Sequence, residues 1–391
     1  MERVHLDASG TEGALLTERC QQGSAAAALH PAFPAVYTAG QTIWTRRVSN
    51  FPLSYKLSWL PRFLRPSLAG DARGFAPAAA TLMPSPARTV RLAFVGDISA
   101  VANRTAPAID PAISRLLASA DLVVGNCESP VVARPAARIG TWLGTRHAMT
   151  EDFLARTLDA AGVARERLAL SVANNHALDQ GVEGLEETCA SLGKLGVRVV
   201  GTAPDEPFAR VPAGPLTVGL AAFTLWRNAG EAEFAGRVAM DAEKARRPAA
   251  AQVDLLCALP HWDWEFCHFP RAGTRALARR LAEHGAGLIV GGHAHVVQPV
   301  ERIAGTLVAY GLGDFLGTAL ARQPWPGRIG AILIVEVSAD AGTRGSVSSY
   351  RTHFFYRLRE GGRERLVPLE ALTGATRDRA MSRLGAVFGG V

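Results

Sequence analysis

Residues 288–295 read Leu288-Ile289-Val290-Gly291-Gly292-His293-Ala294-His295. A short apolar run meets a glycine pair and then two histidines, which is typical of a buried strand of an α/β sheet. Two side chains at i and i+2 on an extended segment point to the same side. We therefore expect this strand end to present two imidazoles together.

Polar residues follow other apolar runs in the same way. In an α/β sheet the strand ends form one crevice, so we expect these polar clusters to converge there. The runs are Leu92–Val95 before Gly96-Asp97, Leu122–Val124 before Asn126-Cys127-Glu128, Leu168–Val172 before Asn174-Asn175-His176 and Asp179, Leu255–Leu259 before His261, Asp263 and Glu265, and Leu307–Tyr310 before Gly313-Asp314-Phe315.

The remaining runs and amphipathic segments predict a layered α/β architecture. Strands are expected at Val197–Val200, Val218–Phe223, Ile329–Val337 and Tyr350–Leu358, and helices at Asp110–Ala118, Glu151–Ala161, Val182–Leu195 and Gly273–His284.

The chain divides by composition into three parts. We expect a Pro/Ala-rich N-terminal extension over residues 1–90 that packs on the core, a metal-binding domain over 91–340, and a β-rich edge and tail of that domain over 341–391. Within the extension, Phe51–Leu64 carries Tyr55, Trp59 and Phe63 at four-residue spacing, which predicts a short amphipathic helix. Such a helix can act as a lid, dock a partner or simply pack on the core.

The composition excludes several classes of protein. With 48% hydrophobic and 20% charged residues among 391, the chain is not globally disordered. Its 42 basic residues against 35 acidic ones are mostly arginines spread along the chain, which does not support nucleic-acid binding. They suit an anionic substrate group, or they reflect genome composition.

The cysteines and the N-terminus bear on location. Five cysteines without a CxxC pair favour neither a disulfide framework nor a cysteine zinc cluster. No signal-peptide pattern and no apolar run of about 18–20 residues is present, so we expect a cytoplasmic protein without a membrane partner.

Asp, Glu, Asn and His at the strand ends are ligands for a divalent cation. Six motifs follow one another in a fixed order, namely Gly96-Asp97, Asn126-Cys127-Glu128, Asn174-Asn175-His176 with Asp179, His261-Trp262 with Glu265, Gly292-His293-Ala294-His295 and Tyr310-Gly311-Leu312-Gly313-Asp314-Phe315. This ordered set resembles the CapA, or poly-γ-glutamate synthesis, branch of the calcineurin-like metallophosphatases over about residues 91–320.

That resemblance implies a four-layer αββα sandwich with a metal site at the strand ends. It also implies that His176 is the histidine that donates a proton to the leaving group in phosphatase members, and that Glu128 bridges two metals. The ligand positions it implies are Asp97, Glu128, Asn175, His261, His293 and His295.

The chain departs from the pattern at three places. Phosphatases of the superfamily usually open with Asp-x-His, but Ile98 and Ser99 follow Asp97, so one imidazole is lost and phosphate-ester hydrolysis is weakened. Asp263 stands where the family usually has glycine, and Asp314 where it has asparagine. Either both carboxylates face histidines, or Asp314 merely replaces Asn and Asp263 is a solvated loop residue.

Histidines paired with carboxylates are acid–base units. The candidate pairs are His176 with Asp179 or Asp97, and His295 with Asp314. Two such units are what inversion of a stereocentre requires, and one CapA-like protein is a lasso-peptide epimerase. We therefore expect a metal-dependent isomerase that acts on a peptide in ribosomal natural-product biosynthesis. The alternatives are a metal-dependent phosphoesterase, a poly-γ-glutamate biosynthesis protein and a non-catalytic scaffold.

The expected cofactor is a divalent metal ion, with Ca²⁺, Mg²⁺ or Mn²⁺ favoured by the lost imidazole, and Zn²⁺ or Fe suited to the retained ones. The expected substrate is a peptide with an anionic group, which an arginine can bind in a bidentate contact. The candidate arginines near the motif loops are Arg104, Arg134, Arg138, Arg146 and Arg227.

Overall fold

The computed structural model describes residues 49–100, 105–134, 146–202, 208–246, 252–317, 323–360 and 363–389. All of these lie in one compact unit, Thr38–Val391.

Within these ranges the first sheet has a parallel half and an antiparallel half. Strand β2 lies at the centre and pairs in parallel with β4 and antiparallel with β14. Strand β13 also pairs in parallel with β2, and β1 pairs with β15. The order is β3 (Ala108–Ile109), β16 (Arg363–Pro368), β15 (Val347–Glu360), β14 (Ile329–Ser338), β2 (Thr89–Ser99), β4 (Leu122–Asn126), β5 (Leu168–Ser171) and β6 (Arg198–Val200), with β1 (Ala79–Thr81) and β13 (Asp314–Gly317) beside it.

The second sheet is parallel at its centre and antiparallel at both edges. Strands β8, β9, β10 and β12 run in parallel, which brings their carboxyl ends to one edge. The order is β11 (Val300–Ile303), β12 (Thr306–Ala309), β10 (Leu288–Val290), β9 (Leu255–His261), β8 (Leu216–Thr224) and β7 (Ala209–Ala213).

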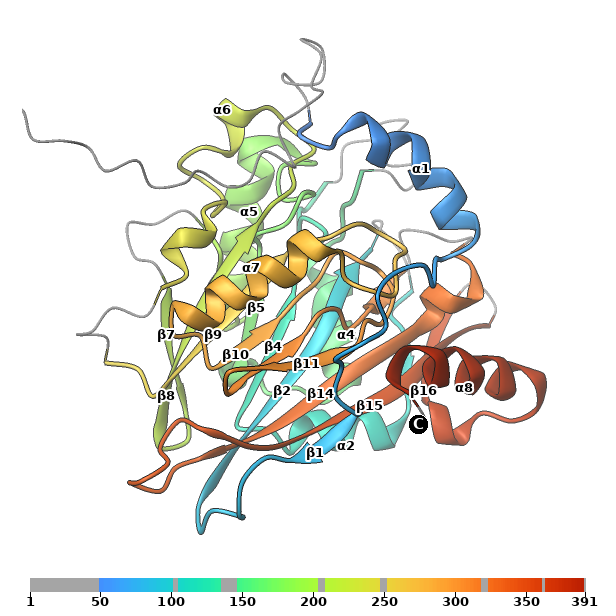
Figure 1. Ribbon diagram of the computed structural model, residues 1–391. Coiled ribbons are helices and arrows are strands. Elements are labelled where there is room, and N and C mark those ends of the chain that lie inside the picture. The colour runs from blue at the N-terminus through green and yellow to red at the C-terminus, as the bar shows by residue number, and fades with distance from the viewer. Residues whose placement is uncertain are drawn as a thin grey trace, which may run out of the picture. The chain divides into compact units, whose positions relative to one another are not determined.

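Burial along β9 shows how the layers stack. Cys257 belongs to the core cluster shared with the first sheet, whereas its neighbours Leu256 and Ala258 pack with Leu277 and Leu281 of α7 (Ala272–Glu283). Alternate residues of a strand face opposite sides, so the second sheet lies between the first sheet and α7 (Figure 1).

The first sheet is likewise covered on both faces. Four consecutive residues of β2, 92–95, are buried, as is typical of a strand between two apolar layers. The same core cluster takes in buried side chains of α2 (Pro111–Ala118), α4 (Glu151–Ala161) and α5 (Gly181–Lys194). The architecture is therefore a four-layer αββα sandwich, which confirms the predicted fold class.

Local sequence explains where the helices begin and end. The Thr150 hydroxyl accepts a hydrogen bond from the Phe153 amide at the start of α4, and Gly162 ends that helix with a φ of 68°. The Asp110 carboxylate caps α2 through the Ala112 amide. Each predicted helix and most of the predicted apolar runs are confirmed to within two residues, whereas β2 and β15 extend three or four residues beyond their predicted bounds. Helix α8 (Gly374–Phe388) and short strands such as β1 and β11 were not predicted.

The amphipathic stretch at 51–64 forms helix α1 (Leu53–Leu64), as predicted. Its inner face carries Tyr55, Trp59 and Phe63, and these rings contact Trp264 or Phe266 in the loop after β9. Residues 1–48, which make up much of the predicted extension, lie outside the described residues. In the part of the chain that the structure describes, no helix is both long and apolar enough to cross a membrane.

Candidate metal and acid–base site

The strand ends of the two sheets meet at one buried site. Asp97 at the end of β2 pairs in register with Asp314 at the start of β13. His261 at the end of β9 forms a bridge with Gly292 after β10. Glu128 follows β4 and is fully buried. The predicted convergence of the polar clusters is confirmed.

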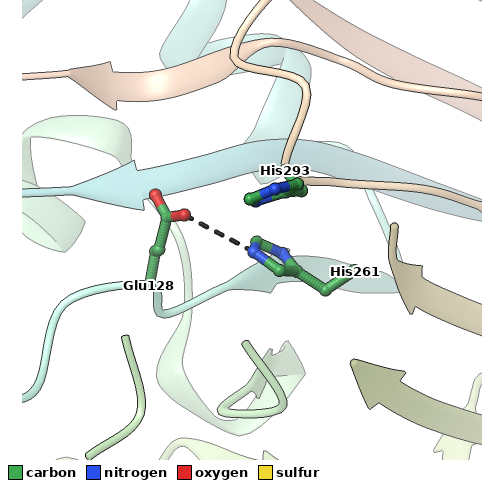
Figure 2. A group of neighbouring side chains, drawn as sticks. All are labelled: Glu128, His261 and His293. Atoms are coloured by element: carbon green, nitrogen blue, oxygen red, sulfur yellow. Dashed lines mark ion pairs between the residues drawn. The ribbon is translucent and has the colours of Figure 1, made fainter. Parts of the chain in front are cut away.

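Glu128, His261 and His293 form a cluster in which one possible ligand atom from each side chain lies within 4.8 Å of the other two (Figure 2). Oε1 of Glu128 lies 3.5 Å from Nε2 of His261, and the two imidazole rings are 4.7 Å apart. Among the described residues, neither Oε1 of Glu128 nor either ring nitrogen of His293 has a hydrogen-bond partner. Buried polar atoms are costly without partners, and a divalent cation would coordinate Oε1 of Glu128 and one ring nitrogen of His293, so this donor set fits a metal.

The other predicted ligands adjoin this cluster. Oδ1 of Asn175 lies 2.8 Å from Nε2 of His261. Asp97 accepts hydrogen bonds from the Asn126 side chain at 2.8 Å and from the His293 amide at 3.0 Å. In two further groups one ligand atom from each side chain also lies within 4.8 Å of the others, namely Glu265 with His293 and His295, and Asp97 with His295 and Asp314. The structure thus brings all six predicted ligands together.

His176 is paired with Asp179, which lies in the turn before α5. Nδ1 of His176 and Oδ2 of Asp179 are 2.6 Å apart. The His147 amide donates to the same carboxylate oxygen at 2.7 Å, and the His147 ring stacks on His176 at 3.6 Å. Of the two partners that the sequence left open for His176, the structure selects Asp179; the pairing with Asp97 is wrong, because Asp97 is engaged by Asn126 and the His293 amide.

His295 is paired with Asp314 in the same manner, with Nδ1 2.6 Å from Oδ1 of the carboxylate. Its other ring nitrogen, Nε2, lies 3.6 Å from Oε1 of Glu128. Asp314 is therefore a direct partner of a histidine and not only a replacement for asparagine.

Burial and neighbouring charge separate the four imidazoles into two kinds. Burial, together with the other site histidines, lowers the pKa of His261 and of His293 far below the ordinary value, which keeps both rings neutral. Neutral imidazole is the form that binds a metal.

The two carboxylate-paired imidazoles behave in the opposite way. Burial alone would lower the pKa of His176, but the carboxylates of Asp179, Glu128 and Glu265 together outweigh burial and raise it. Burial also opposes a charge on His295, yet Glu128 and Asp314 raise its pKa well above the ordinary value. On the acid side, burial raises the pKa of Glu128 to about 8 and raises that of Asp97 as well.

The backbone around the two histidines differs from the expected extended segment. His293 and His295 have φ angles of 85° and 53°, so the chain bends to the left-handed region at both residues and the prediction of an extended i, i+2 pair is wrong. The rings nevertheless lie 6.0 Å apart. Gly292 permits the bend to approach the site, because a Cβ there would lie 2.8 Å from Oδ1 of Asp97.

Asp263 does not join the histidines, and it is not solvated. Its buried carboxylate accepts hydrogen bonds from the Trp264 amide at 2.8 Å and the Arg271 amide at 3.0 Å. Both sequence interpretations of Asp263 are therefore wrong, since its role is to hold the loop that leads into α7.

Ser99 occupies the position at which Asp-x-His phosphatases carry a histidine. Its hydroxyl donates a hydrogen bond to Oε2 of Glu128. A neutral hydroxyl thus lies beside Glu128 at the position where the resemblance leads us to expect an imidazole.

The candidate arginines are placed unevenly. Arg104 and Arg138 lie outside the described residues. Arg134 is exposed, Arg146 donates to the Asp179 carbonyl at 3.4 Å, and Arg227 is buried and paired with Glu231 at 3.0 Å. Recognition of an anionic group by one of them stays a prediction.

Helix α1 contributes residues that the sequence did not assign to the site. The Trp59 indole donates to Oε2 of Glu265, and Nε of Arg62 donates to the Glu265 carbonyl at 3.0 Å. The ring of Phe51, just before α1, stacks at 5.9 Å from His293. In the sequence, only the four-residue spacing of aromatic residues at 51–64 indicated that this helix packs against the rest of the chain. Glu265 was noted there only as part of the motif that begins at His261.

A family model described as "Bacterial capsule synthesis protein PGA_cap" matches residues 91–319. The chain is similar to the PGA biosynthesis protein CapA of Bacillus subtilis (strain 168), with 27% identity over 243 residues, covering 57% of this chain and 62% of that protein. It is also similar to the capsule biosynthesis protein CapA of Bacillus anthracis, with 27% identity over 220 residues and 52% coverage of each. The chain thus spans less than two thirds of the length of these relatives.

Solved structures also resemble the chain. A putative 5'-nucleotidase from Staphylococcus aureus in complex with alpha-ketoglutarate has a TM-score of 0.42 at 15% identity, covering 67% of this chain and 54% of that chain. A phosphatase from Mycoplasma pneumoniae has a TM-score of 0.40 at 12% identity, covering 69% of this chain and 94% of that chain.

Proposed function

Because the chain belongs to the bacterial capsule synthesis protein PGA_cap family, we propose that its buried site makes it a metal-dependent enzyme, and specifically a peptide epimerase. The proposed reaction inverts a Cα stereocentre of a peptide with an anionic group, in the biosynthesis of ribosomal natural products of the lasso type. The observation that carries the proposal is the presence of two imidazole–carboxylate pairs at 2.6 Å, His176–Asp179 and His295–Asp314, in one site.

Each carboxylate fixes which ring nitrogen is free to exchange a proton. Asp179 accepts the Nδ1 proton of His176, so Nε2 is the atom that removes or returns a proton. Asp314 does the same for His295. In the proposed inversion, one Nε2 takes the proton from Cα and the other imidazolium returns its own proton to the opposite face of that carbon. The substrate gains and loses one proton, and no oxidant is needed.

The imidazoles without carboxylate partners have a different proposed role. Glu128, His261 and His293 would hold the divalent cation, and His295 would keep Nε2 for proton transfer. When bound, the cation supplies electrostatic stabilisation of negative charge on the substrate carbonyl oxygen. We favour Ca²⁺, Mg²⁺ or Mn²⁺ because carboxylate and amide oxygens are numerous here, although the two histidine ligands also suit Zn²⁺ or Fe.

A metal-dependent phosphoesterase is the second candidate. It is favoured by His176, which is hydrogen-bonded to Asp179 next to the ligand set. Ser99 counts against it, because the hydroxyl bound to Glu128 stands where the superfamily's first imidazole would be. A role in poly-γ-glutamate biosynthesis is the third candidate and rests on the names of the curated relatives.

A parallel assay separates these candidates. The metal-loaded chain is incubated in heavy water with linear peptides that carry a free C-terminal carboxylate, and deuterium at Cα is measured by mass spectrometry. The same preparation is given aryl phosphate mono- and diesters. Deuterium uptake without ester hydrolysis supports the epimerase, and hydrolysis without uptake would replace it with the phosphoesterase.

A further inference from the structure

A buried arginine outside the family-matched region lies behind the His295–Asp314 pair. Arg357 is on β15 and is 1% exposed. Its Nη2 donates to Oδ2 of Asp314 at 3.1 Å, to the Gln323 side chain at 2.6 Å and to the Gly327 carbonyl. Its Nη1 donates to Glu364 at 3.0 Å.

The Asp314 carboxylate therefore has different partners on its two oxygens. Oδ1 receives Nδ1 of His295, whereas Oδ2 is held by Arg357 and by the side-chain amide of Gln323, each at 3.1 Å. A carboxylate fixed at one oxygen by a planar guanidinium cannot rotate freely, so the direction of the other oxygen is also fixed.

The backbone makes room for this contact. A Cβ at Gly317 of β13 would lie 1.8 Å from Nη1 of Arg357, so only glycine lets the guanidinium lie against this strand. The guanidinium of Arg357 is also ion-paired with two carboxylates, Asp314 at 3.1 Å and Glu364 at 3.0 Å. A buried charge without such a partner is strongly unfavourable.

We propose that Arg357 is a positioning residue for His295. By holding Oδ2 of Asp314, it makes Oδ1 the fixed acceptor of the His295 Nδ1 proton and thereby directs Nε2 of His295 toward Glu128. The imidazole it positions is the one that the proposed epimerisation uses, so the value of this arrangement to the enzyme rests on that proposed function. The hydrogen bond itself can be tested without any substrate.

The test is nuclear magnetic resonance of the 391-residue chain labelled with ¹⁵N at histidine, with His295→Gln used to assign the Nδ1 proton of His295. We expect a low-field, slowly exchanging Nδ1 proton in the wild type that is lost in Asp314→Asn. In Arg357→Gln it should exchange with solvent at least about tenfold faster. Glu364→Gln is the matched control, because it removes the other carboxylate partner of Arg357, and the signal should persist there.

Arg357→Lys keeps the positive charge without the planar guanidinium. Its exchange rate for the His295 Nδ1 proton should lie between those of the wild type and Arg357→Gln. An unchanged exchange rate in folded Arg357→Gln would overturn the proposal. Unfolding of both arginine variants would also overturn it, because Arg357 would then be structural. If the signals respond as expected but the wild type takes up no deuterium at any peptide Cα, the positioning role stands and the epimerase proposal fails.

Discussion

Nε2 of His295 lies 3.6 Å from Oε1 of Glu128, and these two atoms join the acid–base pair to the metal cluster. Glu128 faces His261 on the cluster side, while Asp314 holds the opposite ring nitrogen of His295. A cation held by Glu128 would repel a positive charge on His295. Metal binding and the charge on His295 are therefore linked.

Metal affinity should rise with pH. Glu128 holds a proton in the metal-free protein up to a pKa of about 8, and that proton must leave before the carboxylate can bind a cation. We expect the affinity for Mn²⁺ to increase between pH 6 and about 8 and then level off. Calorimetry in buffers of different ionisation enthalpy measures both the affinity and the protons released. A flat affinity with no proton release would contradict the assignment of Glu128 as a ligand.

The metal-free protein should lose stability as the pH rises. The Glu128 carboxyl titrates near 4.5 when unfolded and near 8 when folded, so the native state binds more protons between these values. The free energy of unfolding therefore falls as pH rises from about 5 to 8. Urea unfolding at several pH values checks this. Glu128→Gln cannot titrate and should reduce the slope; an equal slope in the variant would show that another group is responsible.

His293→Leu should separate stability from metal binding. Both ring nitrogens of His293 are buried without a hydrogen-bond partner among the described residues, so an apolar side chain removes a desolvation cost. We expect the metal-free protein to gain about 1 kcal/mol in unfolding free energy, while metal affinity falls by at least about 100-fold. His353→Gln, on β15 away from the cluster, is the control and should leave the affinity unchanged. Full metal affinity in His293→Leu would remove His293 from the ligand set.

Ser99→His tests why phosphate-ester hydrolysis should be weak. The substitution returns an imidazole to the position beside Asp97 and removes the hydroxyl that donates to Glu128. We expect the number of bound metal ions per chain to rise, and phosphodiester hydrolysis to appear or increase by about tenfold or more. Elemental analysis and an aryl phosphodiester assay measure the two effects. Hydrolysis at full rate in the wild type, with no gain in the variant, would favour the phosphoesterase.

Patterns local in sequence predicted much of the fold and the site. Apolar runs that end in polar residues located strand ends such as Asp97 and His261, because parallel strands bring their carboxyl ends to one edge. The left-handed backbone of His293 and His295 was not visible, since it depends on the close approach of Gly292 to Asp97. Asp263 could not be assigned either, because its partners are backbone amides.

Residues that act from distant elements left no pattern to read. Arg357 is one arginine among many in the sequence. It reaches the Asp314 carboxylate only because β14 pairs with β15 on one side and with β2 on the other. Trp59 lies about two hundred residues before Glu265, and its place over the site depends on how α1 packs. Tertiary contacts of this kind must be seen in three dimensions.

The most direct test of the two-base account uses His176→Gln and His295→Gln separately, with Lys194→Gln on an exposed surface as the control. Each is incubated in heavy water with the L and the D epimer of a peptide that the wild type converts. The wild type and the control should interconvert both epimers and place deuterium at Cα. In each histidine variant the rate of interconversion should fall by about 10²–10⁴-fold. Each variant should exchange the Cα proton of one epimer at most, and the epimer that exchanges should differ between the two variants. Normal interconversion by both variants would contradict the account.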